Sequence, residues 1–280
     1  MASTAYDNLN GMVVNTKAAA IYAAFESSMF LSGQLVPTIQ VPAGSYTAQV
    51  PLLDGAAGFT VDTAEHGAGN DFAAEDITAS DVDATKHEVR AKTYAARTVL
   101  RNIGGVNPTE IGTVIGHKIS NAYDADVMAA LRAGPAAAHT IASGGALTMD
   151  MLFEAASKIR EDGEMGTLVG IISPAMAYQL MQDIQTTSYA GGDYQGEALR
   201  NGFLTQAAGI NLFQSSHAHG AGALGDGVIF GANAARQASF SPLDVTVTPA
   251  PTKVGMDVVG SLAQGVKVID PTRTALITVA

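Results

Sequence analysis

The sequence predicts an α+β fold, and three observations support this class. Apolar residues recur at helical spacing over residues 107–133, which predicts one long helix. Helix and strand patterns alternate over residues 139–233, and the chain beyond residue 237 shows strand patterns only. No internal repeat is present, and 280 residues allow one large domain or two modest ones.

The first predicted element is a short helix over residues 17–26. Ile21, Tyr22 and Phe25 lie at helical spacing within it. A helix this short, with so few apolar residues, has little core of its own and must pack on something else. Residues 39–53 follow with two strand patterns separated by a glycine turn.

Charge is distributed unevenly over the next part of the chain. Residues 54–85 contain eight carboxylates, no lysine or arginine, and few large apolar side chains. Such a length exceeds that of ordinary loops, which indicates a functional excursion or a disordered linker. β-branched and aromatic residues without internal Gly or Pro predict one long strand over residues 88–101. Five of the chain's 15 lysines and arginines cluster here, at Lys86, Arg90, Lys92, Arg97 and Arg101.

The clearest helix start in the sequence precedes the long predicted helix. Asn107 suits the N-cap, Pro108 the first helical position, and Glu110 can complete a capping box. The helix is expected to end at Gly134 and Pro135. About 25 residues at 1.5 Å per residue give a rod of roughly 37 Å.

Two shorter helices and several strands are predicted after it. Thr148 is expected to cap a helix that ends at Gly163, and Ser173-Pro174 to start another. Residues 186–202 have the composition of a polar, glycine-rich loop. Strands are predicted at residues 167–172, 203–204, 210–213, 228–230, 244–248, 256–259, 266–269 and 274–279.

Composition excludes several classes of protein. Hydrophobic residues make up 47% of the chain and charged residues 15%, which excludes a disordered chain. The absence of cysteine excludes disulfides, cysteine zinc sites and thiol nucleophiles. A net charge of −11 disfavours tight binding to nucleic acid. With no signal-peptide pattern and no long apolar run, we expect a soluble protein made inside the cell, without membrane contact.

No group of residues has the pattern of a catalytic site. His217 and His219 offer two imidazoles, but no third metal ligand follows at a diagnostic spacing. Residues 220–225 fit Gly-x-Gly-x-x-Gly without the helix that a phosphate-binding loop needs. Asp124 and Asp126 do not share a helix face and are interpreted as solvated charges. We therefore predict no catalytic residue, no metal and no cofactor, and a protein that is not an enzyme.

Five stretches, taken in order, carry a resemblance to a known family. They lie at residues 15–31, 41–51, 107–133, 171–180 and 202–213. Their order and spacing resemble the major capsid proteins of tailed bacteriophages, which share the Hong Kong ninety-seven capsid fold with bacterial encapsulin shells. The resemblance implies an N-terminal arm (1–38), a long hairpin called the E-loop with its flanking strands (39–88), a peripheral domain with a spine helix (89–138), an axial domain (139–236), and strands that return to the peripheral domain (237–280).

This resemblance implies a structural function. The chain would assemble into pentamers and hexamers of an icosahedral virion shell that encloses double-stranded DNA, and be made and assembled in the bacterial host cytoplasm. A portal protein, a decoration protein and loose contact with the packaged DNA are the further implied partners. Only about 40 residues precede the predicted E-loop, so a scaffolding protein would be separate. Some family members weld their shells by a Lys–Asn bond from an E-loop lysine; residues 54–85 contain no lysine, so we predict none.

The capsid interpretation gives the charged and apolar segments a role between subunits. The acidic segment is expected to pair with cations of a neighbouring subunit, and the arm helix to bury apolar side chains on another one. Single exposed ion pairs are weak, so strength would come from many pairs and many copies. The predicted contact residues are Ile21, Phe25, Phe30, Asp62, Glu65, Asp71, Glu75, Asp76, Arg90, Lys92, Arg97 and Arg101.

Two alternatives remain open from the sequence. An encapsulin-like nanocompartment shell would be favoured by a hydrophobic cargo-docking groove and a neighbouring gene for a cargo enzyme. A metal-dependent hydrolase that uses His217 and His219 would be favoured by stoichiometric metal in the purified protein.

Overall fold

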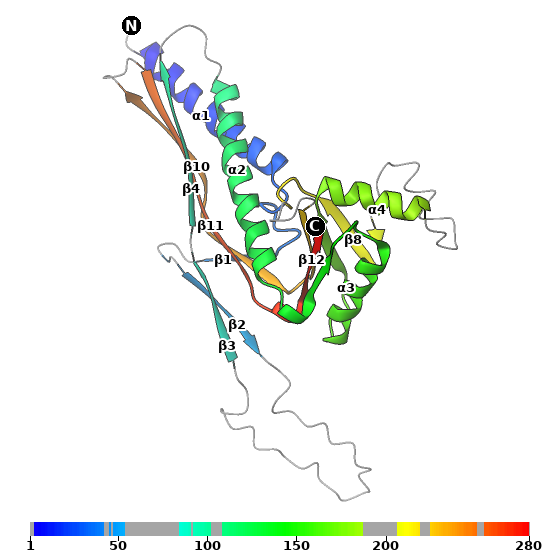
Figure 1. Ribbon diagram of the computed structural model, residues 1–280. Coiled ribbons are helices and arrows are strands. Elements are labelled where there is room, and N and C mark those ends of the chain that lie inside the picture. The colour runs from blue at the N-terminus through cyan, green and yellow to red at the C-terminus, as the bar shows by residue number, and fades with distance from the viewer. Residues whose placement is uncertain are drawn as a thin grey trace, which may run out of the picture.

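The α+β class is confirmed by the computed structural model, which contains helices and three separate sheets (Figure 1). The structure describes residues 3–41, 45, 47–53, 84–90, 92–101, 108–186, 206–218, 225–250 and 255–279. None of the helices in these residues is long and apolar enough to cross a membrane.

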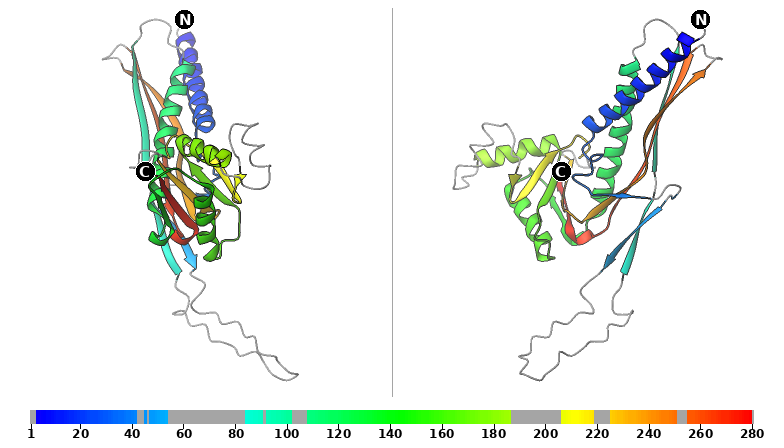
Figure 2. Two further views of the ribbon diagram at one scale, coloured as in Figure 1. Left: turned by 45° about the vertical axis from the view of Figure 1, so that its right-hand side comes forward. Right: turned by 180° about the vertical axis from the view of Figure 1, so that it is seen from behind.

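The first sheet has four strands in the order β1-β10-β11-β4. Their bounds are Thr38–Gln40 for β1, Ala235–Ala250 for β10, Gly255–Val268 for β11 and Lys92–Arg101 for β4. Helices α1 (Ser3–Ser27) and α2 (Pro108–Ala133) pack against each other and against this sheet, as both views in Figure 2 show.

The second sheet has six strands in the order β5-β12-β9-β6-β8-β7, with both parallel and antiparallel pairs. Their bounds are Thr140–Ser143 for β5, Leu168–Ile172 for β6, Gln206–Ala207 for β7, Ile210–Gln214 for β8, Gly225–Gly231 for β9 and Thr274–Val279 for β12. Helices α3 (Met149–Glu161) and α4 (Pro174–Thr186) pack on it. Short 3-10 helices at Ala137–His139 and Pro271–Arg273 lie at its margin.

The third sheet is an antiparallel pair that points away from the two long helices (Figure 1). Strand β2 (Thr47–Leu53) pairs with β3 (Ala84–Arg90) from Thr47 opposite Arg90 to Leu53 opposite Ala84. Most of the acidic stretch, residues 54–83, joins these strands and lies outside the described residues.

Two hydrophobic cores hold the structure together. One lies between α1, α2 and the four-stranded sheet and includes Tyr123, Met128 and Leu131, each completely buried. The other lies between α3, α4 and the six-stranded sheet and includes Leu152 and Ile159, also completely buried. The first core also includes Ile171 of β6 and Val228 and Phe230 of β9, so it joins the helices α1 and α2 to the six-stranded sheet as well.

The predicted starts of the helices are confirmed for α2 and α4. Helix α2 ends at Ala133 as expected, and Asn107, its predicted cap, lies outside the described residues. Ser173 Oγ caps α4 by accepting a hydrogen bond from the Met176 N–H at 3.2 Å. The capping prediction for α3 is wrong: Thr148 makes no side-chain cap, and Asp183 of α4 accepts from the Met149 N–H at 2.9 Å instead.

Helix α1 is much longer than the helix predicted at residues 17–26, since it begins at Ser3. Its first half has little apolar periodicity, so the sequence pattern did not extend that far. The second half of α1 packs along α2, where Thr16, Ala20 and Ala24 lie against Gly112 and Gly116.

Two strand predictions are wrong in ways that change the topology. The strand expected over residues 88–101 is two strands, because β3 pairs with β2 whereas β4 pairs with β11. Strand β12 belongs to the segment 237–280 that was expected to return to the peripheral domain, but it lies between β5 and β9 of the six-stranded sheet. Its alternate residues Ala275, Ile277 and Val279 are buried in that sheet's core, which fixes its place.

Candidate functional site

Helices α1 and α2 make a close contact at two glycines of α2. A Cβ atom added at Gly112 would lie 2.3 Å from the carbonyl oxygen of Thr16, and one at Gly116 would lie 2.3 Å from that of Ala20. Side chains do not approach backbone atoms this closely, so the contact needs glycine at both positions. Four-residue spacing puts both glycines on one face of α2, and Ala20 and Ala24 of α1 lie buried in the contact.

Asp124 of α2 fixes the turn where the chain leaves α1. Its Oδ1 accepts a hydrogen bond from Ser28 Oγ at 2.6 Å, and its Oδ2 accepts one from the Met29 N–H at 3.0 Å. Ser28 Oγ in turn accepts from the Leu31 N–H at 3.0 Å. The interpretation of Asp124 as a solvated charge is wrong, because the side chain is 4% exposed and its carboxylate orders a buried turn.

Gln237 of β10 joins three segments inside the same core. Its Oε1 accepts a hydrogen bond from Tyr123 Oη of α2 at 2.6 Å. Its Nε2 donates to the carbonyl oxygen of Phe30 at 3.1 Å and to Thr38 Oγ1 of β1 at 2.5 Å. Tyr123 and Gln237 are almost completely buried, so these bonds fix the exit from α1 and the edge strand β1 against α2.

The buried carboxyl of Asp124 makes the stability of this region depend on pH. Burial raises its pKa above the ordinary value near 3.8, against the opposing effect of the hydrogen bonds from Ser28 and Met29. A carboxyl with a higher pKa in the folded state binds its proton more tightly there. The free energy of unfolding therefore falls as pH rises from the ordinary pKa of the carboxyl, which applies in the unfolded chain, through its raised pKa in the folded chain.

We expect Asp124→Asn to remove this contribution. The free energy of unfolding of the wild type, minus that of the variant, should decrease as pH rises from about 4 to about 7. Urea denaturation at a series of pH values measures both free energies. A difference that stays constant with pH would contradict the assignment of a raised pKa to Asp124.

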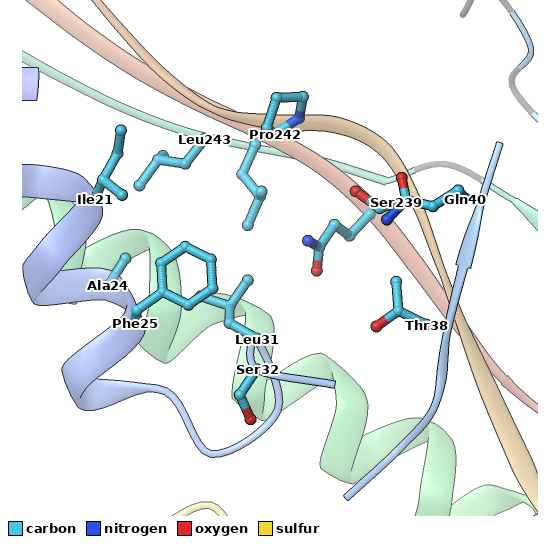
Figure 3. Close-up of a pocket in the computed structure, with 12 residues that line it drawn as sticks. Ile21, Ala24, Phe25, Leu31, Ser32, Thr38, Gln40, Ser239, Pro242 and Leu243 are labelled. Carbon is cyan, nitrogen blue, oxygen red and sulfur yellow. The ribbon is translucent and has the colours of Figure 1, made fainter. Parts of the chain in front are cut away.

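A pocket of about 350 Å³ opens between α1, β1, β10 and β11 (Figure 3). Ile21 and Phe25 of α1 line one side, and Pro242 and Leu243 of β10 line another. No lining residue carries a charge. Gln264 of β11 also lines the pocket; it is 9% exposed, and its Oε1 has no hydrogen-bond partner within the described structure.

An exposed apolar stripe on α1 runs up to this pocket. Val14, Tyr22 and Phe25 are 63%, 71% and 52% exposed, and Ala18 lies exposed between them at helical spacing. Lys17 Nζ, beside the stripe, pairs with Asp244 Oδ1 of β10 at 2.5 Å. The stripe and the pocket together form one surface, which we call the α1 surface; exposed Glu26, one turn after Tyr22, adds a negative charge at its end.

Comparison with known proteins finds similarity in structure only. No model of a known protein family matches the sequence, and no curated protein sequence matches it significantly. The capsid structure of cyanophage P-SCSP1u matches with a TM-score of 0.64 at 16% identity, over 87% of this chain and 86% of that one. Microbacterium phage Oxtober96 gives a TM-score of 0.65 at 14% identity, over 90% and 91% of the two chains.

This chain has the Hong Kong ninety-seven capsid fold. An encapsulin complex from Synechococcus elongatus also matches, with a TM-score of 0.59 at 10% identity over 89% of this chain and 86% of that one. The segments predicted as the N-terminal arm, the E-loop and the spine helix contain α1, the pair β2 and β3, and α2, and the predicted domain bounds stay predictions. The fold predicted from the order of the sequence segments is confirmed.

The predicted apolar contact residues of the arm divide into two groups. Phe30 is completely buried in the core of its own chain and is held by the network around Gln237. The prediction that Phe30 contacts another subunit is therefore wrong. Phe25 is half-exposed and Ile21 is partly buried, both at the α1 surface, so a contact by these two residues stays a prediction.

The predicted charged contacts are not tested by the described residues. The backbone of Arg90 lies at the end of β3, and those of Lys92, Arg97 and Arg101 lie along β4. Their acidic partners lie outside the described residues: Asp62, Glu65, Asp71, Glu75 and Asp76. The electrostatic contact between neighbouring subunits stays a prediction.

Sequence reasoning missed the residues that organise the α1 surface. Gln237 and Gln264 stand within strand patterns, and nothing in the pattern marks them as buried. The spacing of Gly112 and Gly116 in a helix was a detectable sign of a close helix contact. Of the two histidines considered for a metal, His219 lies outside the described residues, and no described group of three His, Asp or Glu residues could hold a metal ion.

Proposed function

We propose that this chain is the major capsid protein of a tailed phage, which assembles into the pentamers and hexamers of an icosahedral shell around double-stranded DNA. The observation that carries the proposal is the match to phage capsid structures over 87% and 90% of this chain. The match also covers 86% and 91% of those capsid chains, so the likeness extends over most of both proteins.

The shape of the chain supports assembly with other copies. Strands β2 and β3 extend from the main body as a two-stranded ladder (Figure 2). Ala48 and Val50 of β2 pack on Ala238 and Phe240 of β10, so only the part of the ladder beyond this contact would need a neighbour for stability. The α1 surface adds exposed apolar side chains at a second place on the molecule, away from β2 and β3. A neighbouring subunit would cover both, and contacts between different surfaces generate closed rings when the rotation permits.

The proposed role is structural and needs no catalytic residue, metal or cofactor. It places the protein in the virion capsid, made and assembled in the cytoplasm of the bacterial host. A separate scaffolding protein, a portal protein and a decoration protein are proposed partners. Contact with DNA would be loose and independent of sequence, because the chain has a net charge of −11.

The charged contact between subunits is tested by reversing two cations of β4. We expect Arg97→Glu together with Arg101→Glu to reduce the assembled fraction and to make assembly more sensitive to salt, since the acidic segment of a neighbour would meet like charge. Sedimentation at several salt concentrations measures the assembled fraction. Assembly equal to that of the wild type at every salt concentration would remove this contact from the proposal.

An encapsulin-like nanocompartment is the second candidate, favoured by the structural match to an encapsulin complex. Light scattering and negative-stain microscopy of the purified protein test both candidates together. Particles in the megadalton range support a shell, and a phage head is expected to be larger than a nanocompartment. A compact monomer or dimer at high concentration, unchanged by scaffold or crowding agent, would contradict both.

A further inference from the structure

The sulfur chemistry of this chain is limited to methionine, because the sequence has ten methionines and no cysteine. Oxidants that attack sulfur act on a thioether according to how easily they reach it. Met165 is 81% exposed. Every other methionine whose side chain the structure describes is buried or partly buried: Met29, Met128, Met149, Met151, Met176 and Met181. Among these side chains, access therefore singles out Met165.

Met165 stands on a turn between α3 and β6 that hydrogen bonds hold in place. Oε1 of Glu164 accepts a hydrogen bond from the Gly166 N–H at 3.0 Å, and its Oε2 accepts one from Arg273 Nη1 at 3.1 Å. Asp270 pairs with Nε of the same arginine at 2.9 Å. The preceding residue is thus tied to the short 3-10 helix before β12, which keeps the turn from folding Met165 inward.

The surroundings of Met165 are open. Gly163 has a φ of +90°, and a Cβ atom added there would have no atom within 4 Å. Gly166, on the other side, also lacks a side chain that could cover the sulfur. A small oxidant in water can therefore approach Met165 without any opening of the fold.

We propose that Met165 is a reversible oxidation site, converted to its sulfoxide by hydroperoxides and restored by a thiol-dependent sulfoxide reductase. In the forward step the sulfur lone pair attacks one peroxide oxygen and the O–O bond breaks. The sulfur loses two electrons, and the other oxygen leaves as water or an alcohol after taking up the proton. In the reverse step two thiols supply two electrons, become a disulfide and release the oxygen as water.

The oxidised chain should keep its fold. The sulfoxide is polar, and at an exposed position its oxygen remains in water. We expect the Tm of the chain oxidised at Met165 to change by no more than about 2 °C, as for an ordinary surface substitution. Met165→Gln, which places a polar side chain of similar length there, should also leave the Tm within that range. A larger fall in Tm for the variant would contradict the exposed position.

Peptide mass spectrometry of the dilute, unassembled full chain after brief treatment with hydrogen peroxide tests the proposal. Met165 should be oxidised at least about tenfold faster than Met128 and Met149, which react only when the fold opens. In urea strong enough to unfold the chain, the three rates should become similar. The matched control Met165→Leu should lose the fast reaction, and the buried methionines should react as slowly as in the wild type.

Reversal is measured on the same oxidised sample. Treatment with a methionine sulfoxide reductase and dithiothreitol should return the Met165 peptide to its unmodified mass. The proposal is wrong if Met165 reacts no faster than Met128 in the folded chain, or if its sulfoxide persists under the reductase. None of these measurements requires assembly, so failure of the capsid proposal would leave this inference standing, and its own failure would leave the capsid proposal untouched.

Discussion

Replacing Gly116 by alanine is expected to lower the free energy of unfolding of the unassembled chain by about 2 kcal/mol. Alanine is favoured over glycine within a helix by about 1 kcal/mol, so helix propensity alone predicts the opposite sign. The added methyl group would lie 2.3 Å from the backbone oxygen of Ala20, and backbone cannot move aside as a flexible side chain can. Urea denaturation measures the difference.

A matched glycine provides the control for this substitution. Gly144 follows β5, and a Cβ atom added there would have no atom within 4 Å. Gly144→Ala should therefore change the free energy of unfolding by no more than about 0.5 kcal/mol. If Gly116→Ala were equally neutral or stabilising, the close contact of α1 with the spine helix would be wrong.

Gln237→Leu is expected to lower the free energy of unfolding by about 3 kcal/mol, because leucine keeps the volume but breaks three hydrogen bonds at once. The hydroxyl of Tyr123 would lose its acceptor, and the carbonyl of Phe30 and the hydroxyl of Thr38 would lose their donor. The exit from α1 and strand β1 should then loosen. Limited proteolysis near residues 28–37, together with urea denaturation, reports both effects.

An exposed glutamine serves as the comparison for Gln237. Gln182 lies on the surface of α4, where its Nε2 donates to Tyr178 Oη at 2.9 Å. Gln182→Leu removes a hydrogen bond that water can replace, so we expect a change within about 0.5 kcal/mol. Equal losses for the two variants would show that the network around Gln237 has no special weight.

The sequence predicted the spine helix well because every local preference agreed with the final structure. Apolar residues recur through α2, proline begins it and glycine follows its end. Helix α1 had no such agreement, since its apolar residues do not gather on one face, and its second half is held by close packing on α2. A local sequence pattern identifies a helix that has a periodic apolar face. It does not identify a helix such as α1, whose small residues pack against glycines of a helix far away in the sequence.

The pairing partners of the strands could not be predicted from local sequence patterns for a similar reason. Residues 88–101 have one continuous β pattern, yet they divide between β3 and β4, which pair in different sheets. Strand β12 has the same alternation as its neighbours in sequence, and only the six-stranded core decides where it lies. The pocket at the α1 surface was equally hidden, because α1, β1, β10 and β11 meet there from distant parts of the chain.

The buried hydrogen bonds of Asp124 and Gln237 affect assembly because they set the position of the arm. Asp124 and Gln237 hold the exit from α1 against the spine helix, and the α1 surface lies on the helix just before that exit. A loosened exit would let α1 move relative to β10 and open the pocket. Variants that weaken either network should therefore reduce assembly as well as stability.

The central claim, that many copies of this chain form a phage-type shell, is tested most directly by cryo-electron microscopy of the purified, assembled protein. The account predicts closed icosahedral particles whose density is built from pentamers and hexamers, with α2 of every subunit recognisable as a long rod. The strands β2 and β3 of each subunit should lie against a neighbour. Particles without icosahedral order, or a chain that stays monomeric at high concentration with scaffold or crowding agent, would contradict it.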